Sequence, residues 1–160
     1  MTDKNVSIMN IGSMGYLPQV FKKIENEKKL NIVYLGGSIT MGCNATKTEL
    51  RYVDRSAKWW QTNFPDAEIS YFNAGIGATT SQFGVARVQE HVLDKQPDLV
   101  FVEFSVNDSS SPLFMETYES LVRRLLKAES VKAVVLINNL FYDTGTNAQG
   151  IHNAIGLHYR

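Results

Sequence analysis

Ser38 stands where a serine can act as a nucleophile. It directly follows two glycines in the segment 31–42, which reads Asn-Ile-Val-Tyr-Leu-Gly-Gly-Ser-Ile-Thr-Met-Gly. The apolar run at 32–35 predicts a strand buried on both faces, as in a parallel sheet. The glycines permit a tight turn that a ligand can approach closely, and ligands bind at the carboxyl edge of open α/β sheets. A serine at this edge is a nucleophile if a base can reach it.

Three other interpretations of this segment remain open. Ser38 could cap the next helix, or the turn could hold a phosphate, as glycine-rich strand-to-helix turns do. No lysine lies between Gly36 and Gly42, so the P-loop pattern is absent. Cys43 could be a second nucleophile, although we expect it to be a small buried apolar residue.

Two further strand ends carry small or polar residues. A loop with Gly75, Gly77 and Ala78 follows a predicted strand at 68–73, and Asn107 and Asp108 follow another at 99–104. Because the carboxyl ends of parallel strands share one edge, we expect these residues to meet near Ser38. Acyl transfer needs a nucleophile and donors aimed at the developing oxyanion. Backbone N–H groups around Gly77 and Ala78, with the amide of Asn107, could be those donors.

Each of these loops also has a purely structural interpretation. Asn107 and Asp108 could form only a turn or a cap before the next helix. Gly75 and Gly77 could serve only a tight turn. A dinucleotide-binding fingerprint fails, since Thr80 stands where its third glycine belongs.

The elements that must position these residues alternate along the whole chain. Apolar patterns predict strands at 31–35, 68–73, 99–104 and 133–137. They predict helices at 52–64, 81–95 and 148–159, and others that begin at Pro18 and Pro112. Such alternation indicates βαβ units and a parallel sheet covered on both faces. We expect an N-terminal arm at 1–17 and one domain at 18–160.

The composition excludes several function classes. Of 160 residues, 16 are basic and 16 acidic, so nothing suggests a nucleic-acid partner. No apolar stretch is long enough to predict a membrane span, and a metal or other cofactor is not expected. The N-terminus lacks an apolar signal core, which favours a cytoplasmic location, although secretion after removal of a signal peptide stays open.

The pair Trp59 and Trp60 could line a sugar site, but one core and one half-exposed ring is the expected arrangement.

Three segments resemble the conserved blocks of the SGNH hydrolases, also called the GDSL esterase family. Residues 36–40, Gly-Gly-Ser-Ile-Thr, resemble block I. Residues 73–81, Asn-Ala-Gly-Ile-Gly-Ala-Thr-Thr-Ser, resemble block II, and residues 105–108, Ser-Val-Asn-Asp, resemble block III. The resemblance implies a three-layer α/β/α sandwich with a parallel, flavodoxin-like sheet. It also implies Ser38 as the nucleophile, with an oxyanion hole formed by its own N–H, the Ala78 N–H and the Asn107 side chain.

Two positions depart from the family pattern. Ala78 replaces the usual block II glycine, and it can serve only if its backbone dihedrals allow. Ser105 replaces the block III glycine and tightens the space near the site. The Gly-Gly-Ser-Ile-Thr version resembles a subset that acts on acylated carbohydrates, which implies an O-acetyl sugar ester or another small ester as substrate.

The resemblance also predicts that the catalytic base is absent from these 160 residues. The family takes its base and orienting acid from Asp-x-x-His in block V, a pattern that does not occur here. His152 is the candidate substitute, but Gln149 stands where the aspartate belongs, and Ile151 and Ile155 place His152 within a helix. We therefore expect a truncated, inactive chain that associates with itself or with its missing C-terminal segment. The alternatives are a non-catalytic glycan- or partner-binding relative and a nucleotide- or phosphate-binding domain.

Overall fold

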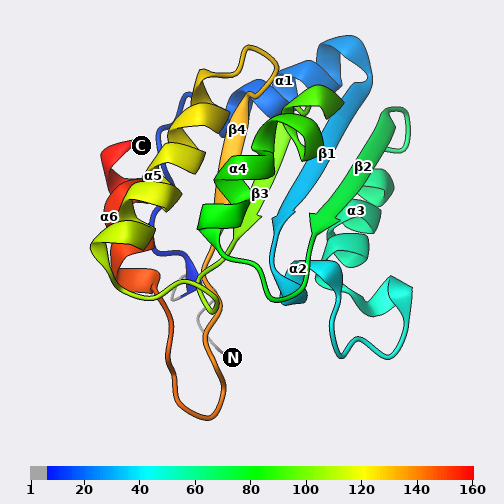
Figure 1. The fold of residues 1–160 in the computed structure, drawn as a ribbon. Helices are drawn as coiled ribbons and strands as arrows, with labels where there is room; N and C mark the ends of the chain where they lie inside the picture. Colours follow the sequence, from blue (N-terminus) through cyan, green and yellow to red (C-terminus); the bar gives the residue numbers. More distant parts are fainter. Residues whose placement is uncertain (1–6) are drawn as a thin grey trace.

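The computed structural model describes residues 7–160 and has three layers, with a sheet between two layers of helices (Figure 1). The sheet contains four strands in the order β2-β1-β3-β4. Their bounds are β1 (Lys29–Gly36), β2 (Glu68–Gly75), β3 (Leu99–Glu103) and β4 (Ala133–Ile137). Every neighbouring pair is parallel. The expected α/β class and the four expected strands are confirmed.

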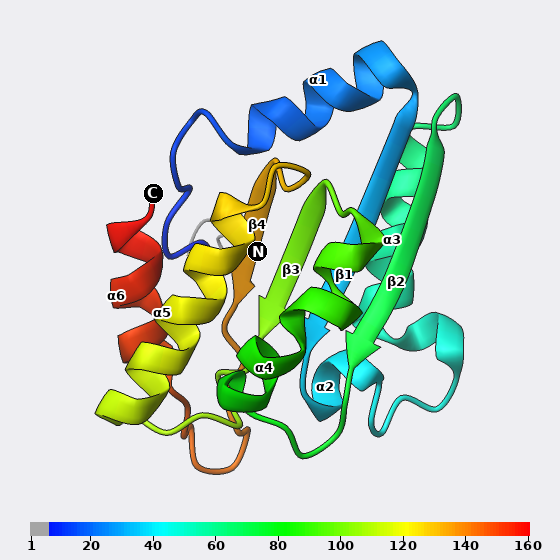
Figure 2. The same cartoon turned by 45° about the horizontal axis from the view of Figure 1, so that its top comes forward.

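Helices cover both faces of this sheet (Figures 1 and 2). One face carries α4 (Ser81–His91), α5 (Pro112–Lys127) and α6 (Gln149–His158), and the other carries α1 (Leu17–Glu27) and α3 (Tyr52–Asn63). The expected helix at 81–95 is wrong in its last turn, because the helical dihedrals end at Val92 and a separate 3-10 turn, η3 (Leu93–Lys95), follows. Two short elements were not expected: α2 (Ser38–Met41) and the 3-10 turn η2 (Thr48–Leu50).

The middle strand β1 is buried on both sides, as its apolar run predicts. Val33 and Leu35 pack into the cluster with α4, α5 and α6, whereas Ile32 and Tyr34 pack into the cluster with α1 and α3. All four side chains are fully buried. Because successive side chains of a strand point to opposite faces, this uninterrupted apolar run joins the two cores.

The register aligns three strand ends at one edge of the sheet. Gly36, at the end of β1, pairs with Gly75 at the end of β2 and with Glu103 at the end of β3. The loops that follow these strands therefore leave the sheet together, and they carry the residues singled out from the sequence.

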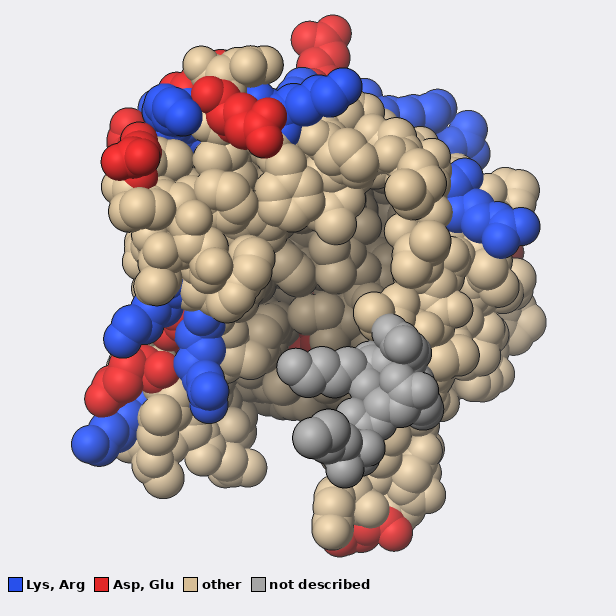
Figure 3. Space-filling view, turned by 180° about the vertical axis from the view of Figure 1, so that it is seen from behind, with Lys and Arg blue, Asp and Glu red and all other residues tan. Residues whose placement is uncertain are grey.

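The opposite flank of the sheet ends at β4, whose outer edge no strand pairs within the described residues. Residues 134–137 of this strand are only partly buried. The face seen from behind carries most of its charged side chains around the rim and is hollowed and largely uncharged toward its centre (Figure 3). None of the helices between residues 7 and 160 is long and apolar enough to cross a membrane.

The expected N-terminal arm is described only in part. Residues 1–6 of the arm lie outside the described residues, and α1 begins at Leu17. The side chains of Ile8, Met9, Ile11 and Met14 are exposed.

Candidate active site

Ser38 is the first residue of α2, directly after β1 and its glycine turn. The N-cap of this four-residue helix is Gly37, and no side chain caps it. The interpretation of Ser38 as a helix cap is therefore wrong. The N–H of Gly37 donates to the carbonyl of Glu103 at 3.3 Å, which holds the turn against the end of β3.

The three loops expected to meet do so around Gly37 and Ser38. A Cβ placed on Gly37 would lie 2.5 Å from Oδ1 of Asn107 and 3.4 Å from the carbonyl oxygen of Thr79. A Cβ placed on Gly77 would lie 4.0 Å from Cβ of Ser38. Ser38 and Asn107 thus lie at the same edge of the sheet, with the 75–80 loop beside them.

Close backbone approach explains two of the glycines. A Cβ on Gly75 would lie 2.2 Å from the backbone nitrogen of Met41, so only glycine lets the end of β2 touch α2. Gly37 likewise leaves room for the side chain of Asn107. The glycines of these loops therefore allow close contact between the loops, in addition to allowing tight turns.

Two backbone donors point to the same functional interpretation. Within residues 7–160, no acceptor bonds the N–H of Ser38 or the N–H of Ala78. Ala78 has φ of 56°, the left-handed region that favours glycine, so alanine adopts here the backbone of the residue it replaces. The condition placed on Ala78 by the sequence is met.

Asn107 presents its side chain with a defined orientation. Its Oδ1 atom faces Gly37 and is buried without a hydrogen-bond partner among the described residues. Because the amide is planar, its NH₂ group is directed away from Gly37. An NH₂ group is the part of asparagine that can donate to an oxyanion.

A buried polar layer beneath α2 was not anticipated. Glu103 is fully buried, and its Oε2 accepts a hydrogen bond from Oγ1 of Thr40 at 3.1 Å. Burial raises the pKa of Glu103. Oγ1 of Thr40 also lies 2.9 Å from the hydroxyl of Tyr52. The single polar residue in the apolar run 99–104 was the sequence signal for this layer.

Two other side chains tie the loops together. Asn73 donates to the carbonyl of Thr40 at 2.8 Å and accepts from the N–H of Gly75 at 2.9 Å. Arg87 of α4, 6% exposed, donates to the carbonyl of Gly36 at 3.2 Å, and burial lowers its pKa. The Asn73–Thr40 and Arg87–Gly36 contacts join residues far apart in sequence, and no local pattern predicted them.

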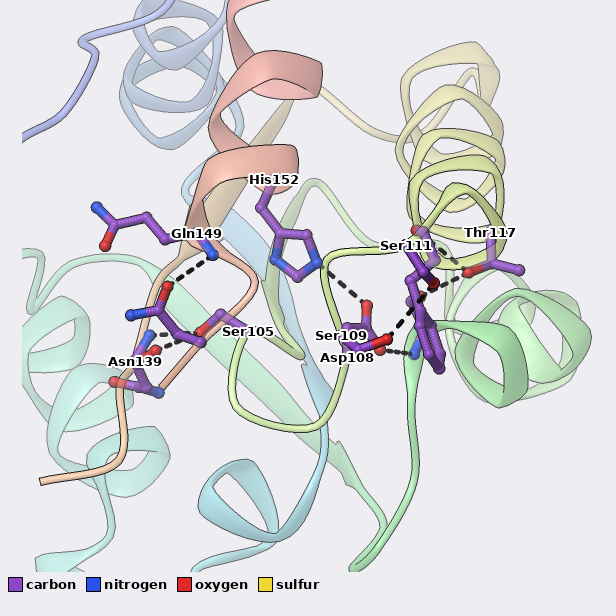
Figure 4. Close-up of polar contacts among 11 residues, drawn as sticks. Ser105, Asp108, Ser109, Ser111, Thr117, Asn139, Gln149 and His152 are labelled. Atoms are coloured by element: carbon purple, nitrogen blue, oxygen red, sulfur yellow. Dashed lines mark hydrogen bonds and ion pairs between the residues drawn. The ribbon is translucent and has the colours of Figure 1, made fainter. Parts of the chain in front are cut away.

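Asp108, the residue after Asn107, forms a buried pair with His152 (Figure 4). Nε2 of His152 lies 3.1 Å from Oδ2 of Asp108, and both side chains are 0% exposed. Oδ1 of Asp108 accepts the N–H of Ser81 at 2.9 Å. Asp108 therefore caps α4 and not the helix that follows it, whose N-cap is Ser111.

No histidine of the chain hydrogen-bonds Ser38 in the part that the structure describes. His152 contacts Asp108, His91 contacts Arg87, and the ring of His158 packs against Tyr159. The structure thus brings together Ser38, the two loops and Asn107, and places the candidate base His152 in a separate buried pair.

Several features of the structure lie away from this sheet edge and contribute no residue to the candidate site. Trp60 is 6% exposed and Trp59 is 52% exposed, the arrangement expected for the pair. A surface hollow of about 460 Å³ beside Trp59 is lined by residues of η2 and α3 and by none of the site residues.

Cys43 is exposed, so its expected burial is wrong: it lies in the turn after α2, outside both cores. Residues 7–160 contain no group of three or more side chains that could hold a metal ion.

A parallel sheet whose edge joins a serine to several hydrogen-bond donors is typical of α/β serine hydrolases. Residues 34–155 match the GDSL-like Lipase/Acylhydrolase family, and the chain belongs to this family. A comparison with curated proteins finds no match.

Solved structures agree with this assignment. A two-domain esterase, CEX, described as active on acetylated mannans, is 49% identical over 94% of this chain, with a TM-score of 0.91. The fold is shared with AlinE4, an SGNH-hydrolase esterase, at 21% identity over 82% of this chain and 72% of that chain, with a TM-score of 0.65. It is also shared with a variant of Axe2, an acetyl-xylooligosaccharide esterase from Geobacillus, at 20% identity over 81% and 71%, with a TM-score of 0.63. The chain spans 40% of the length of the two-domain esterase.

Proposed function

We propose that this chain supplies the nucleophile and the oxyanion hole of a serine esterase that removes O-acetyl groups from a carbohydrate. The observation that carries the proposal is the meeting of Ser38 with Asn107 and the 75–80 loop at one sheet edge. A base must also reach Ser38, and the reaction then follows the general scheme of serine acyl transfer.

In the first half-reaction, Oγ of Ser38 attacks the acetyl carbonyl carbon and loses its proton to the base. The negative charge that develops on the carbonyl oxygen is stabilised by the N–H groups of Ser38 and Ala78 and by the NH₂ of Asn107. The carbon–oxygen bond to the sugar breaks, and the sugar oxygen takes the proton. Water then attacks the acetyl-serine, which releases acetate and restores Ser38.

The carbohydrate substrate is inferred from similarity. The two-domain esterase that shares 49% of aligned residues acts on acetylated mannans, and a second crystal structure of it was obtained with mannopentaose. Because that protein is 2.5 times as long as the matched region, the acetylated glycan remains a proposal for this chain.

We also propose that residues 1–160 alone are inactive or nearly so. A serine nucleophile needs a histidine and an orienting acid. His152 hydrogen-bonds the carboxylate of Asp108, and both members of that pair are buried. The base of the active protein would then come from residues other than these 160.

The decisive experiment measures acetate release from acetylated manno-oligosaccharides and hydrolysis of p-nitrophenyl acetate. It compares the 160-residue chain with a longer form of the protein, each with its Ser38→Ala variant. We expect turnover by the longer form, its loss in Ser38→Ala, and turnover near background for residues 1–160. Robust hydrolysis by residues 1–160, abolished by Ser38→Ala and also by His152→Ala, would refute the proposal that these residues lack the catalytic base.

The main rival is a relative that binds glycans without catalysis. A fluorophosphonate forms a covalent bond with an activated serine, so labelling of Ser38 in the longer form supports the esterase. Glycan binding with neither labelling nor turnover would favour the rival. A nucleotide-induced rise in Tm would favour a phosphate-binding domain instead.

A further inference from the structure

Asp108 connects the two loops that carry the candidate oxyanion donors. It follows Asn107 directly in the chain, and its Oδ1 accepts the N–H of Ser81, the first residue of α4. Ser81 lies three residues after Ala78. A carboxylate at a helix N-terminus is favourably placed against the helix dipole. Movement of this one carboxylate would therefore disturb the positions of both Asn107 and Ala78.

His152 holds this carboxylate from the opposite side (Figure 4). Its Nε2 lies 3.1 Å from Oδ2 of Asp108. A carboxylate only accepts hydrogen bonds, so Nε2 is the donor. The imidazole ring is stacked on Tyr118 with 3.5 Å between ring centroids and 3° between planes. The ring is thus held by one hydrogen bond and one flat packing contact.

The same geometry separates His152 from the chemistry of acyl transfer. The residue is 1% exposed, and its Nδ1 is buried without a partner among the described residues. A general base must exchange protons with the nucleophile and with the leaving group. A ring enclosed between Asp108 and Tyr118 has no such access.

The turn that carries Asn107 is anchored from other elements as well. Oγ of Ser105 donates to the carbonyl of Asn139 at 2.8 Å, and the carbonyl of Ser105 accepts the N–H of Ala148 at 2.7 Å. These contacts fix the start of the turn, and the His152–Asp108 pair fixes its end. The serine that replaces the usual block III glycine thus has a structural use.

We propose that His152 is a positioning residue for the acyl-transfer site: it fixes Asp108, and through Asp108 it holds Asn107 and the loop that ends at Ser81. The inference rests on the proposed esterase function. It gives the one buried histidine a role distinct from that of the base.

The first test is kinetic and uses a form of the protein that hydrolyses p-nitrophenyl acetate. His152→Ala is expected to lower kcat by about tenfold to a hundredfold with little change in KM, because a misplacement of about 1 Å costs on that order. His152→Gln is expected to recover most of the loss, since its amide can also donate to Asp108. His158→Ala, on the exposed side of the same helix, is the matched control. An unchanged kcat in His152→Ala, or a failed recovery in His152→Gln, would overturn the proposal.

The second test asks whether His152 acts through Asn107. In the Asn107→Ala background, His152→Ala is expected to lower kcat by a smaller factor than in the wild type, because one of the two donors that it positions is already absent. An equal loss in both backgrounds would show that His152 does not act through Asn107 and would overturn that part of the proposal. Tm is measured for every variant, so that a loss of folded protein is recognised.

A third measurement does not depend on turnover. In ¹H–¹⁵N spectra of the 160-residue chain, His152→Ala is expected to shift the backbone amides of Ala78, Ser81 and Asn107, and His158→Ala is expected to leave them in place. Unmoved amides would refute the positioning role. Shifted amides in a protein without any esterase activity would refute the proposed function alone.

Discussion

The presence of asparagine at position 107 is explained better by the chemistry of its side chain than by a need for a turn. Its Oδ1 is buried against Gly37, and its planar amide directs the NH₂ group away from Gly37. A residue needed only for the turn would not require an amide in this place. The residue-scale question is whether that amide contributes to turnover.

Replacing Asn107 by alanine should therefore reduce kcat and leave the fold intact. Loss of one oxyanion donor costs about 10²–10³ in kcat. The measurement is the kcat for an acetyl ester in an active form of the protein, with Tm as the check on folding. An unchanged kcat would show that Asn107 serves only the turn.

Glu103 should make the free energy of unfolding decrease as pH rises, which is the opposite of the usual effect of a carboxylate. Burial raises its pKa in the folded chain, so the folded state holds its proton more tightly than the unfolded state. Its stabilising contribution is fully present below the ordinary glutamate pKa of about 4.3, and it is lost as pH rises through the raised folded value.

Urea unfolding of the wild-type chain and of Glu103→Gln across this pH range tests that sign. The free energy of unfolding of the wild type, relative to that of Glu103→Gln, should fall with rising pH by about 1.4 kcal/mol for each unit of pKa shift. Glu25→Gln, at an exposed position of α1, is the control. A difference between wild type and Glu103→Gln that does not change with pH would contradict the prediction.

At the scale of elements, the site depends on close contact between α2 and the end of β2. Asn73 bonds the carbonyl of Thr40, and Gly75 lies against the backbone of Met41. The four residues of α2 are too few to form a stable helix alone. Their conformation is therefore supported by the strands and loops around them.

A methyl group at Gly75 should disrupt this contact. The added Cβ would lie 2.2 Å from a backbone nitrogen, and α2 would have to move. We expect Gly75→Ala to lower the free energy of unfolding by about 1–3 kcal/mol, as overpacking does. Esterase activity in a competent form should fall as well.

Gly150→Ala is the matched control for this substitution. It lies in α6, and its added Cβ would meet no atom within 4 Å. Alanine is the better helix former, so stability should stay equal or rise by up to about 1 kcal/mol. Urea unfolding of both variants decides the prediction, and equal effects of the two would contradict it.

At the scale of the whole molecule, the outer edge of β4 is a surface open to association, since no strand pairs it within residues 7–160. An unpaired edge strand is a template for association, and natural edges are commonly blunted by charge or proline. The sequence of β4, Ala-Val-Val-Leu-Ile, contains neither. We propose that this edge and the hollowed face beside it make residues 1–160 associate with themselves or with a further segment of the protein.

A lysine on β4 should weaken that association. Val135 is partly buried in the cluster with α1 and α3, and Val135→Lys would place a charge on this face of the edge strand. Sedimentation of the wild-type chain should show concentration-dependent oligomers, and Val135→Lys should shift them toward monomer. Thr62→Lys, on α3, is the control of equal charge, and thermal unfolding of each variant checks the fold. A wild-type chain that stays monomeric would contradict the prediction.

The class of fold and the residues of the candidate site were predictable from the order of the amino acids. Strands and helices were predictable because each depends on a local hydrophobic period. The run before Ser38 has no polar alternation, and it became β1, buried on both faces. The meeting of three strand ends followed from the rule that parallel strands share a carboxyl edge, and their matched ends at Gly36, Gly75 and Glu103 confirm it.

The contacts that support these residues became visible only in the folded chain. The contact between Thr40 and Glu103 joins residues 63 positions apart, and that between Asp108 and His152 joins residues 44 apart. Glu103 is a polar residue in an apolar run, but no local pattern identifies the partner in either pair, because the pairing arises from the way that helices pack on the sheet. Burial, too, belongs to the folded chain. His152, a candidate base by residue type alone, became a buried partner of Asp108 when α6 packed against α5.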